Sequence, residues 1–543
     1  MISSPSAPPK KNNGLIVEQS PIDSYLAQQQ QLQTPVARFS DKHASLTAEG
    51  AQSYSDLIPL SKPSAHQQYA FEVNLDQCTG CKACVAGCHS MNGLNENEMW
   101  RDVGTIIDTQ SAQPYQQTIT SACHHCIDPA CLNGCPVLAY DKDPVTGIVR
   151  HLDDQCIGCQ YCVLTCPYDV PKFSDSLGIV RKCDMCHQRL EVGEAPACVQ
   201  ACPTEAIKIT LVDVPVIIEQ SKDVSSFLPG APSPQITQPT TQYISSKPIP
   251  QTAQAADANS LRPEHAHFPL VFMLTLSQGG IGALIIAAVA FLMQHSDLSG
   301  ATLRIIGTAY FFAALGISVL HLGRPQGAWR AFLGWRKSWL SREILVFGPF
   351  AGLAFGYMTL YFIPSSNYIF VPFNNYIEQC LAGLVIAIGL TAILASSMVY
   401  VATKRFSWRA PITFNSFYGS ALVIGLAATL PVTSSIYFTL GFLLAVAVRL
   451  SIESLRLRAV FKPNHLDHLL ARRCLTSLKG YTVSRFSTAL LASFCAITAT
   501  TQPALSTLFG ALALLFITLS ELMERTLFFQ SVVAPKMPGG FRR

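Results

Sequence analysis

The chain is 543 residues long; 49% of them are hydrophobic and only 13% are charged, whereas about 25% are charged in an average soluble domain. Together with a positive mean hydropathy of +0.29, this composition excludes a disordered protein and argues against a wholly soluble one. A formal net charge of +4 is small for this length, so we expect no nucleic acid among the partners. Sixteen of the 19 cysteines lie between Cys78 and Cys202, which divides the chain into a cysteine-dense module and an apolar one.

Composition predicts four segments. Residues 1–70 are polar, include a run of four glutamines and show no Sec or Tat signal, so we expect a flexible polar tail. Residues 71–212 are the cysteine-dense module. Residues 213–263 are rich in proline, serine, threonine and glutamine, a composition typical of a partly extended linker. Residues 264–543 are dominated by long uncharged runs.

The uncharged runs predict eight transmembrane helices. A helix needs about 20 apolar residues to cross about 30 Å of hydrocarbon. The run Ile412–Val448 is too long for one helix and divides at Pro431, and Phe486–Leu519 divides in the same way at Gln502-Pro503. A large soluble helical core would need charged helix faces, which these runs lack. Four further runs supply one span each: Leu270–Met293, Leu303–Leu320, Ile344–Ile363 and Cys380–Thr403.

The distribution of lysine and arginine between the loops predicts an orientation. An even number of spans puts residues 1–263, the even-numbered loops and the C-terminus on one side of the membrane. The loops and tail of the membrane half hold 20 lysines and arginines on that side, and the other side holds Arg304 alone. By the positive-inside rule, the cysteine module faces the cytoplasm. We therefore expect a multi-pass protein of the bacterial inner (plasma) membrane, embedded in its lipid bilayer.

The sixteen clustered cysteines form four groups of regular spacing. The first and third groups follow C-x2-C-x2-C-x3-C, the second follows C-x2-C-x4-C-x3-C-P, and the fourth follows C-x2-C-x11-C-x3-C-P. Groups one and three share Gln-Cys-x-Gly-Cys-x-x-Cys-Val, and groups two and four share Pro-Ala-Cys-x-x-x-Cys-Pro, which indicates an internal duplication. In chain order the groups are Cys78, Cys81, Cys84 and Cys88; Cys123, Cys126, Cys131 and Cys135; Cys156, Cys159, Cys162 and Cys166; and Cys183, Cys186, Cys198 and Cys202.

This spacing predicts four 4Fe–4S clusters. Three thiolates on a tight loop can bind three corners of a cubane, and a fourth cysteine at the start of a short helix binds the other cluster of a pair. Structural zinc pairs two C-x2-C knuckles in one four-ligand site, and disulfides need an oxidising compartment, so both alternatives fit less well. We therefore expect a small α+β module of the double ferredoxin-like type, held together by its clusters and followed by an all-α bundle of eight transmembrane helices. The cysteines outside the module fit no ligand pattern: Cys380, Cys474 and Cys495.

Both modules resemble subunits of one enzyme family. Residues 71–212, with their four cysteine groups, resemble the four-cluster iron–sulfur subunit of dimethyl sulfoxide reductase-type molybdoenzymes. Residues 264–543 resemble the eight-helix membrane anchor of that family. These subunits are usually two polypeptides, and here they are fused. The anchor resemblance rests on three stretches: His321-Leu322-Gly323-Arg324-Pro325, Ser338-Trp339-Leu340-Ser341-Arg342-Glu343, and the tail from Glu524-Arg525 to Pro538-Gly539.

The resemblance implies how the cysteines pair, the first group with the fourth and the second with the third. Some relatives replace the second cysteine of the third group and hold a 3Fe–4S cluster there. This sequence keeps Cys159, so four cubanes are expected. The implied ligand sets are Cys78, Cys81, Cys84 and Cys202; Cys183, Cys186, Cys198 and Cys88; Cys123, Cys126, Cys131 and Cys166; and Cys156, Cys159, Cys162 and Cys135.

The resemblance also makes the anchor a haem-free oxidase of quinol, either menaquinol or ubiquinol, from the membrane quinone pool. His321 and Glu343 match the positions of the quinol site in that family, and an imidazole beside a carboxylate can accept the two protons that quinol releases. Relatives often have a basic residue six positions after the histidine, where this chain has Gly327; Arg324 and Arg330 are the candidates to replace it. No haem b is expected because every histidine of the membrane half lies in a loop or at a helix end: His265, His267, His295, His321, His465 and His468.

Structural roles are open for the same residues. Glu343 suits the positive N-terminus of a helix with Ser341 as its cap. His321 suits an ordinary position at the membrane interface.

Our leading hypothesis is an electron-transfer and membrane-anchor subunit for anaerobic respiration. It oxidises quinol and passes electrons through four clusters to a separate catalytic subunit that contains molybdopterin. Nothing in the 543 residues resembles a molybdenum-binding domain, so the terminal substrate is reduced elsewhere. The alternatives are a cytoplasmic partner like assimilatory nitrate reductase, reverse flow from a dehydrogenase to quinone, and a non-redox metal-binding scaffold.

Overall fold

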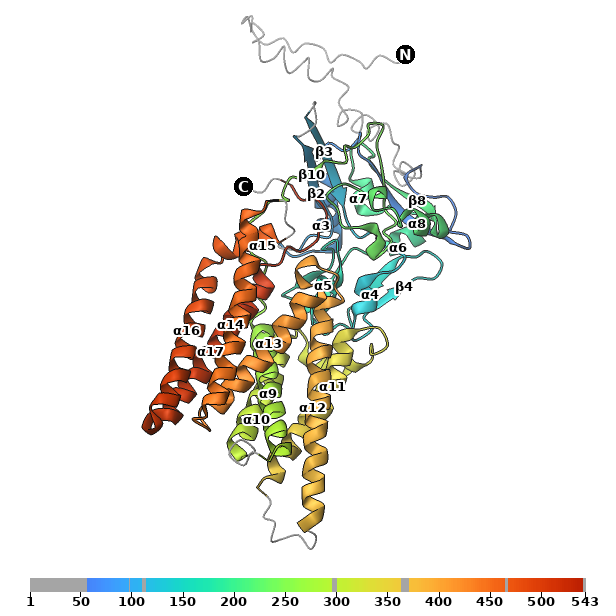
Figure 1. Cartoon of the computed structure of the whole chain (residues 1–543). Helices are drawn as coiled ribbons and strands as arrows, with labels where there is room; N and C mark the ends of the chain where they lie inside the picture. The colour runs from blue at the N-terminus through green and yellow to red at the C-terminus, as the bar shows by residue number, and fades with distance from the viewer. Residues whose placement is uncertain are drawn as a thin grey trace, which may run out of the picture.

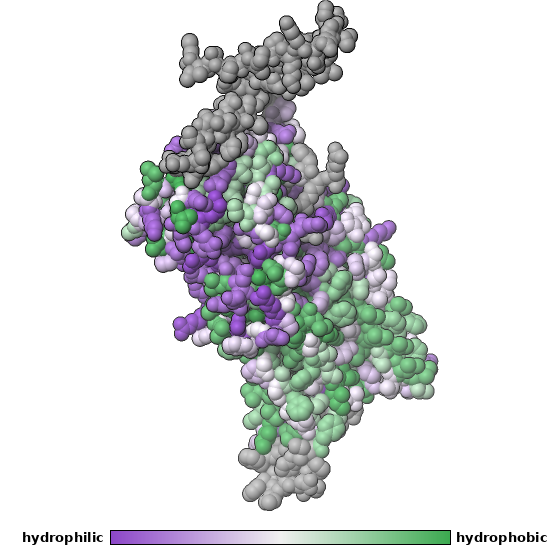
Figure 2. All heavy atoms as spheres, turned by 180° about the vertical axis from the view of Figure 1, so that it is seen from behind, coloured by the Kyte–Doolittle hydropathy of each residue, from purple (hydrophilic) through white to green (hydrophobic). Residues whose placement is uncertain are grey.

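The computed structural model describes residues 56–96, 98–109, 114–294, 300–362, 371–463 and 467–540. Most of the predicted tail, together with His295 and His465, lies outside these ranges. In Figure 1 the cysteine module stands at one end of a bundle of long helices. Figure 2 shows the same division by hydropathy, with hydrophilic residues over the module and hydrophobic residues over the long helices. The expected fold class, a small α+β module followed by an all-helical membrane half, is confirmed.

Two three-stranded sheets frame the cysteine module. In the first, β1 (Gln67–Asn74) pairs antiparallel with β8 (Ile207–Asp213), which brings the two ends of the module together. The first and fourth cysteine groups adjoin these two strands in the sequence, so the pairing also brings those groups together. In the second sheet, β2 (Asp102–Asp108) pairs with β3 (Tyr115–Ser121). The remaining strands of the module form two ribbons: β4 (Tyr140–Lys142) with β5 (Val149–His151), and β6 (Lys172–Ser174) with β7 (Ile179–Arg181).

Short helices carry cysteines from each of the four motifs. Two of them start directly after a left-handed residue, Lys82 with φ of 62° and Gln160 with φ of 58°. Such a residue reverses the chain sharply before the helix begins. The helices that carry cysteines are α3 (Ala83–Asn92), α4 (Ala130–Gly134), α5 (Tyr161–Thr165) and α7 (Ala197–Gln200), and α6 (His187–Glu191) directly follows Cys186.

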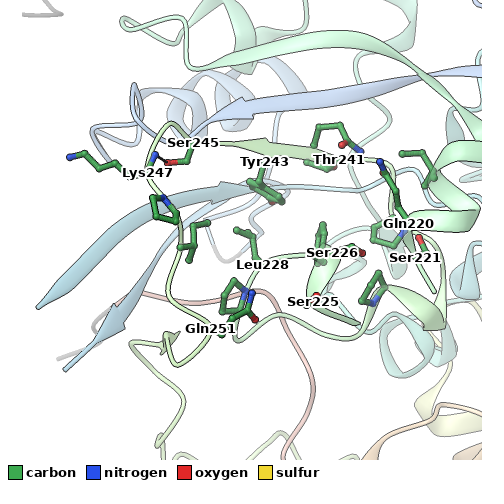
Figure 3. A pocket seen from close by; sticks show the side chains of 18 residues that line it. Gln220, Ser221, Ser225, Ser226, Leu228, Thr241, Tyr243, Ser245, Lys247 and Gln251 are labelled. Atoms are coloured by element: carbon green, nitrogen blue, oxygen red, sulfur yellow. Dashed lines mark hydrogen bonds between the residues drawn. The ribbon is translucent and has the colours of Figure 1, made fainter. Parts of the chain in front are cut away.

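Residues 213–263 pack on the module through elements of their own. After α8 (Val214–Gln220), β9 (Gln242–Ile244) joins β1 in parallel and β10 (Gln254–Ala255) joins β2. Between these elements the segment encloses a pocket of about 340 Å³, with Tyr243 among the side chains that line it (Figure 3). The two sheets of the module therefore each take one strand from this segment.

Among its described residues, the membrane half contains eight helices that are long and apolar enough to span a bilayer, as predicted. The two long runs divide where proline was expected to divide them: one helix ends at Thr429, and another begins after Pro503. A short helix, α15 (His468–Leu475), lies between the sixth and seventh spans. The eight are α9 (Phe268–Leu292), α10 (Ala301–Ser318), α11 (Trp339–Leu360), α12 (Val371–Val401), α13 (Ala410–Thr429), α14 (Ile436–Leu457), α16 (Lys479–Thr501) and α17 (Ser506–Gln530).

Helix α9 is the centre of the bundle. In its most apolar stretch of 18 residues, 72% are buried, the largest share among the eight. The helix packs against α10, α12, α13 and α17. Small residues permit this packing, since a Cβ on Gly282 would lie 1.9 Å from the carbonyl oxygen of Ala421 in α13. Helices in lipid commonly associate through such close backbone approach.

Several basic residues counted for the orientation are buried inside the bundle. Arg449 and Arg485 both bind Glu521, at 2.7 and 2.9 Å, and Arg525 is buried in the same region. Because paired charges of this kind belong to helix packing rather than to loops, they should not be counted. Seventeen basic residues remain on the module side. Arg304, the one basic residue of the other side, is also buried and forms a 2.5 Å ion pair with a glutamate of α12.

Candidate metal centres and quinol site

The sixteen clustered thiols lie in four sets of four, and the members of each set are close enough to interact electrostatically. The grouping is the one that the resemblance implies, because the closing cysteine of one group lies beside three thiols of another. We number the sets as follows: set 1 is Cys78, Cys81, Cys84 and Cys202; set 2 is Cys88, Cys183, Cys186 and Cys198; set 3 is Cys123, Cys126, Cys131 and Cys166; set 4 is Cys135, Cys156, Cys159 and Cys162.

The surroundings of the thiols suit 4Fe–4S cubanes. Sets 1 and 3 each ring a small cavity, and in the described part of the chain no three His, Cys, Asp or Glu side chains converge closely enough to hold a single ion. Backbone N–H groups of Ala139 and Ala206 donate to the sulfurs of Cys135 and Cys202 at 3.2 and 3.3 Å, an interaction that stabilises cluster-bound thiolates. All nineteen cysteines are free thiols. Burial raises the pKa of Cys88 to about 12, whereas a coordinating metal ion favours the thiolate form.

Glycines give the motif loops their tight turns. Gly80 and Gly158 each stand between the first two cysteines of a motif, with φ of 73° and 68°, a conformation that glycine adopts without strain. Space is limited as well, because a Cβ on Gly158 would lie 2.4 Å from the carbonyl oxygen of Gly178. The glycine shared by groups one and three is therefore needed for the turn, and in group three also for packing.

The four sets form a line. Cys84 of set 1 interacts with Cys198 of set 2, and Cys183 of set 2 interacts with Cys123 of set 3. Tyr140 lies against cysteines of both set 3 and set 4. Sets 1 and 4 are therefore the two ends, and stepwise electron transfer needs such a succession of neighbouring sites.

Set 4 lies directly against the anchor. The loop between α10 and α11 presents Gly323 to two glycines of the module, and a Cβ on Gly158 would lie 2.9 Å from the Cα of Gly323. Leu322 packs against the hydrophobic cluster that contains the set 4 cysteines. The first anchor motif therefore docks on the loop that carries Cys156 and Cys159.

Arg324 and Arg330, the weaker candidates for the quinol site, bind this same loop. Nη1 of Arg324 donates to the carbonyl oxygen of Asp153 at 2.9 Å, and Nη1 of Arg330 donates to that of Asp154 at 2.9 Å. Guanidinium groups that bind backbone carbonyls hold two surfaces together. In the described structure both guanidinium groups therefore contact the module.

The other two anchor motifs also contact the module. Ser338 Oγ donates to the carbonyl oxygen of Gly134 at 2.7 Å, one residue before Cys135 of set 4. The tail after α17 returns to β2, where the N–H of Thr105 donates to the carbonyl oxygen of Gly539 at 3.2 Å. All three stretches on which the anchor resemblance rests therefore reach the junction.

Glu343 is buried where helix α5 of the module meets the bundle. Tyr161 of α5 belongs to the core of the bundle, and its hydroxyl donates to the carbonyl oxygen of Val399 at 2.8 Å. The Glu343 carboxyl lies close to the phenols of Tyr161 and Tyr400, and its Oε1 has no hydrogen-bond partner among the described residues. Tyr161 also interacts with Cys159. One phenol thus lies between the buried carboxyl and a set 4 cysteine.

A cavity of about 190 Å³ opens beside Tyr161, at the seam between module and anchor. Trp339, Lys337 and Lys404 line it from the anchor side. An aromatic ring and two basic side chains at a membrane surface suit a flat polar ring whose tail remains in lipid.

His321 has different neighbours from Glu343. It ends the short 3-10 helix Val319–His321, where its Nδ1 is hydrogen-bonded to the carbonyl oxygen of Ser318. Its imidazole interacts with that of His267, whose ring centre is 4.9 Å from that of His265. Burial, followed by the two neighbouring imidazoles, lowers the pKa of His267 to about 4. The structure therefore places His321 in a group of three histidines.

Sequence analysis did not single out Tyr161, and it considered His267 only as a possible haem ligand. The signal for Tyr161 lay in the duplication, because group one has Ala83 at the position that Tyr161 occupies in group three. A large aromatic residue in only one copy indicates a contact that only that copy makes. For His267, which follows a proline-rich stretch and precedes a span, the sequence offered no comparable signal.

Comparison with known proteins agrees with this arrangement. Residues 114–211 match the family described as 4Fe-4S dicluster domain, and residues 264–530 match the family described as DMSO reductase anchor subunit (DmsC). The protein is 33% identical over 182 residues to the B subunit of anaerobic dimethyl sulfoxide reductase of Haemophilus influenzae, a match that covers 32% of this protein and 87% of that subunit. The chain belongs to the family of the iron–sulfur B subunits of dimethyl sulfoxide reductase. The predicted fusion of such a subunit with a membrane anchor is confirmed.

Other relatives of the cysteine module have names that refer to different enzymes. Hydrogenase-2 operon protein HybA of Escherichia coli O157:H7 is 36% identical over 157 residues, which cover 24% of this chain and 48% of that protein. The formate dehydrogenase iron–sulfur subunit of Haemophilus influenzae is 31% identical over 188 residues, which cover 30% of this chain and 60% of that protein. The chain thus spans about half the length of HybA.

Proposed function

We propose that this chain oxidises quinol at the junction of its two modules and passes the electrons through four 4Fe–4S clusters to a separate catalytic subunit that contains molybdopterin. The observation that carries the proposal is the contact of set 4 with the anchor, where Gly158 and Gly323 approach without a side chain between them. When bound, each cubane supplies a site that takes up and releases one electron. Sets 1 to 4 are the proposed ligands, sixteen cysteines for four clusters.

Glu343 is the proposed acceptor of a proton from quinol. Oxidation to quinone releases two electrons toward set 4 and two protons. The free Oε1 of Glu343 can take one proton, and Tyr161 borders both this carboxyl and the 190 Å³ cavity. That cavity is the proposed place for the quinone ring, and no haem b is required. His321, at the end of its helix, is the proposed acceptor of the second proton, which it passes to the aqueous side.

The proposed orientation places the module in the cytoplasm, with the anchor in the bacterial inner membrane. The seventeen basic residues that remain on the module side support it. A cytoplasmic module would serve a catalytic partner in the same compartment, such as a sulfoxide or N-oxide reductase or one like assimilatory nitrate reductase.

Reverse flow is a second candidate function. Two relatives of the module are named after a formate dehydrogenase and a hydrogenase operon. With such a partner the same line of sets would carry electrons from set 1 to set 4 and reduce quinone at the junction. Cluster potentials below that of the quinone pool would favour this direction.

Cluster reduction by quinol tests the proposed function. In Glu343→Gln, a reduced quinol analogue should reduce the clusters about 100-fold more slowly, the usual effect of losing one proton acceptor. Dithionite should reduce them normally, because the thiol sets are unchanged. Arg342→Gln is the matched control, since Arg342 adjoins Glu343 but binds the carbonyls of Trp335 and Arg336. Wild-type rates with quinol in Glu343→Gln would place the site elsewhere.

Purification of the intact complex in mild detergent identifies the partner. A large subunit with bound molybdenum should accompany the chain, and its reducible substrates would choose between the candidate partners. Recovery of a dehydrogenase would support the reverse direction.

A further inference from the structure

Among the described residues of the module, one arginine and one lysine are buried. Arg101, directly before β2, and Lys182, directly before Cys183 of set 2, are each only 2% exposed. A buried cation is costly unless negative charge lies close to it. The groups around these two side chains therefore indicate what they are there to balance.

Arg101 has donors without an acceptor. Its Nη1 donates to Thr120 Oγ1 at 3.2 Å, and its guanidinium lies 4.7 Å from the ring centre of Phe71. Nε and Nη2 have no hydrogen-bond partner among the described residues. Thr120 Oγ1, which accepts from Arg101, lies 3.5 Å from the sulfur of Cys84 of set 1. The other thiols with which Arg101 interacts electrostatically belong to set 2: Cys88, Cys183 and Cys198.

Lys182 has the equivalent place between sets 2 and 3. Its Nζ donates to the carbonyl oxygens of Val149 and Cys183, the latter at 2.9 Å. The Lys182 side chain lines the cavity that set 3 rings, and its main electrostatic neighbours are Cys123 and Cys131 of set 3, Cys183 of set 2 and Asp184. Each cation therefore lies between two successive sets, and set 2 adjoins both.

The neighbouring imidazole of His125 does not share this charge. Its Nδ1 accepts a hydrogen bond from the backbone N–H of Val149 at 3.1 Å. A ring nitrogen that accepts a hydrogen bond carries no proton, so this imidazole is neutral.

We propose that Arg101 and Lys182 are positioning residues for electron transfer, whose charges raise the reduction potentials of the clusters held by sets 1 and 2 and by sets 2 and 3. Reduction adds one electron to a cubane and neither forms nor breaks a bond. A fixed cation stabilises the more negative, reduced form more than the oxidised form. The free N–H groups of Arg101 can also donate to cluster sulfur, which acts in the same direction. The inference rests on the proposed ligand sets.

The expected shift in reduction potential differs between the sets. The principal thiol neighbours of both cations belong to sets 1 to 3. Set 4, at the anchor, is therefore the internal reference. An electron that enters at set 4 would pass Lys182 between sets 3 and 2, and then Arg101 between sets 2 and 1.

A potentiometric titration followed by EPR, on the complete complex, tests the inference. For each set, one Cys→Ser variant is made, and the EPR signal that this variant loses is assigned to the cluster of that set. Arg101→Gln should shift the midpoints of sets 1 and 2 to more negative potential, and Lys182→Gln should shift those of sets 2 and 3. The expected size is on the order of a tenfold change in the ratio of oxidised to reduced cluster, which is 59 mV for a one-electron couple. The midpoint of set 4 should remain in place.

Matched variants separate charge from structure. Arg101→Lys and Lys182→Arg keep the charge and should stay near the wild-type midpoints. Arg150→Gln removes an arginine of the same module that pairs with Asp141 at a partly exposed position, and should shift none, because solvent screens it.

Iron content distinguishes this inference from the proposed function. The inference would be overturned, and the proposed function left intact, if the Gln variants held about 16 irons per chain, four for each cubane, and their midpoints were unshifted. Equal shifts in the charge-retaining and the Gln variants would also overturn it. Loss of iron from both Gln variants would assign these residues to cluster assembly instead of tuning. Wild-type protein with about 8 irons would overturn the ligand sets themselves.

Discussion

Gly323 of the anchor lies against the carbonyl oxygen of Gly178 of the module so closely that a Cβ at position 323 would be 2.1 Å from that oxygen. Carbon and oxygen atoms in contact normally stay more than about 3 Å apart. The two modules therefore meet backbone to backbone at this point, beside Gly158 in the loop of set 4.

Replacing Gly323 should separate the two modules locally. Gly323→Ala should lower the free energy of unfolding by about 1–3 kcal/mol, the usual cost of overpacking, and should slow cluster reduction by quinol but not by dithionite. Gly348→Ala in α11 is the control, because nothing lies within 4 Å of its Cβ. Quinol-driven rates measured by stopped-flow absorbance should distinguish the two variants; equal rates would mean that the glycine contact is not needed for electron entry.

Iron analysis should give about 16 irons per chain, since four sets of four thiols suit four cubanes. Cys186→Ser should change the EPR signal of set 2 and leave the others intact, because Cys186 belongs to no other set. Cys495→Ser, in α16 and outside all four sets, should leave every signal unchanged. A change in all signals with Cys186→Ser would contradict independent ligand sets.

Cysteine labelling should establish the orientation. In a Cys380→Ser background, which removes an exposed thiol of the membrane half, Thr433→Cys should react with an impermeant reagent from outside the cell. Lys462→Cys, on the module side, should react only after the membrane is opened. The opposite pattern would place the module outside.

Acid should destabilise the folded protein through His267. Its pKa is lowered to about 4, so the unfolded chain, with a pKa near 6.5, binds the proton more readily. This contribution to stability is complete above pH 6.5 and is lost as the pH falls toward 4. From pH 7 to pH 5, the free energy of unfolding measured by chemical denaturation should fall by about 1–2 kcal/mol more in the wild type than in His267→Gln. Equal losses would refute a neutral, buried imidazole.

Most of the architecture could be predicted from composition and spacing. Eight spans follow from apolar length, and prolines mark the divisions within Ile412–Val448 and Phe486–Leu519 because proline interrupts a helix. The cysteine motifs predict compact groups for the same local reason. Both signals are carried by residues close in sequence, so no tertiary information is needed to read them.

The docking surface could not be predicted in this way. Arg324 and Arg330 look like any basic residues beside a span, and their acceptors are backbone carbonyls about 170 positions earlier in the chain, which no side-chain pattern reveals. Arg449 and Arg485 were counted as loop charges for a similar reason. Each lies inside a helix, and its partner, Glu521, comes from another helix far along the chain.

The path of the polypeptide between its two halves also bears on stoichiometry. β9 and β10 are strands of the module's own sheets, and residues 256–267 alone lead from β10 to the first residue of α9. A short covalent connection holds docking partners at an effective concentration of about the millimolar range. Occupancy of the junction is therefore independent of dilution and of unequal synthesis, and each anchor receives one module. Cleavage within residues 256–267 would turn the same docking into an equilibrium between two molecules.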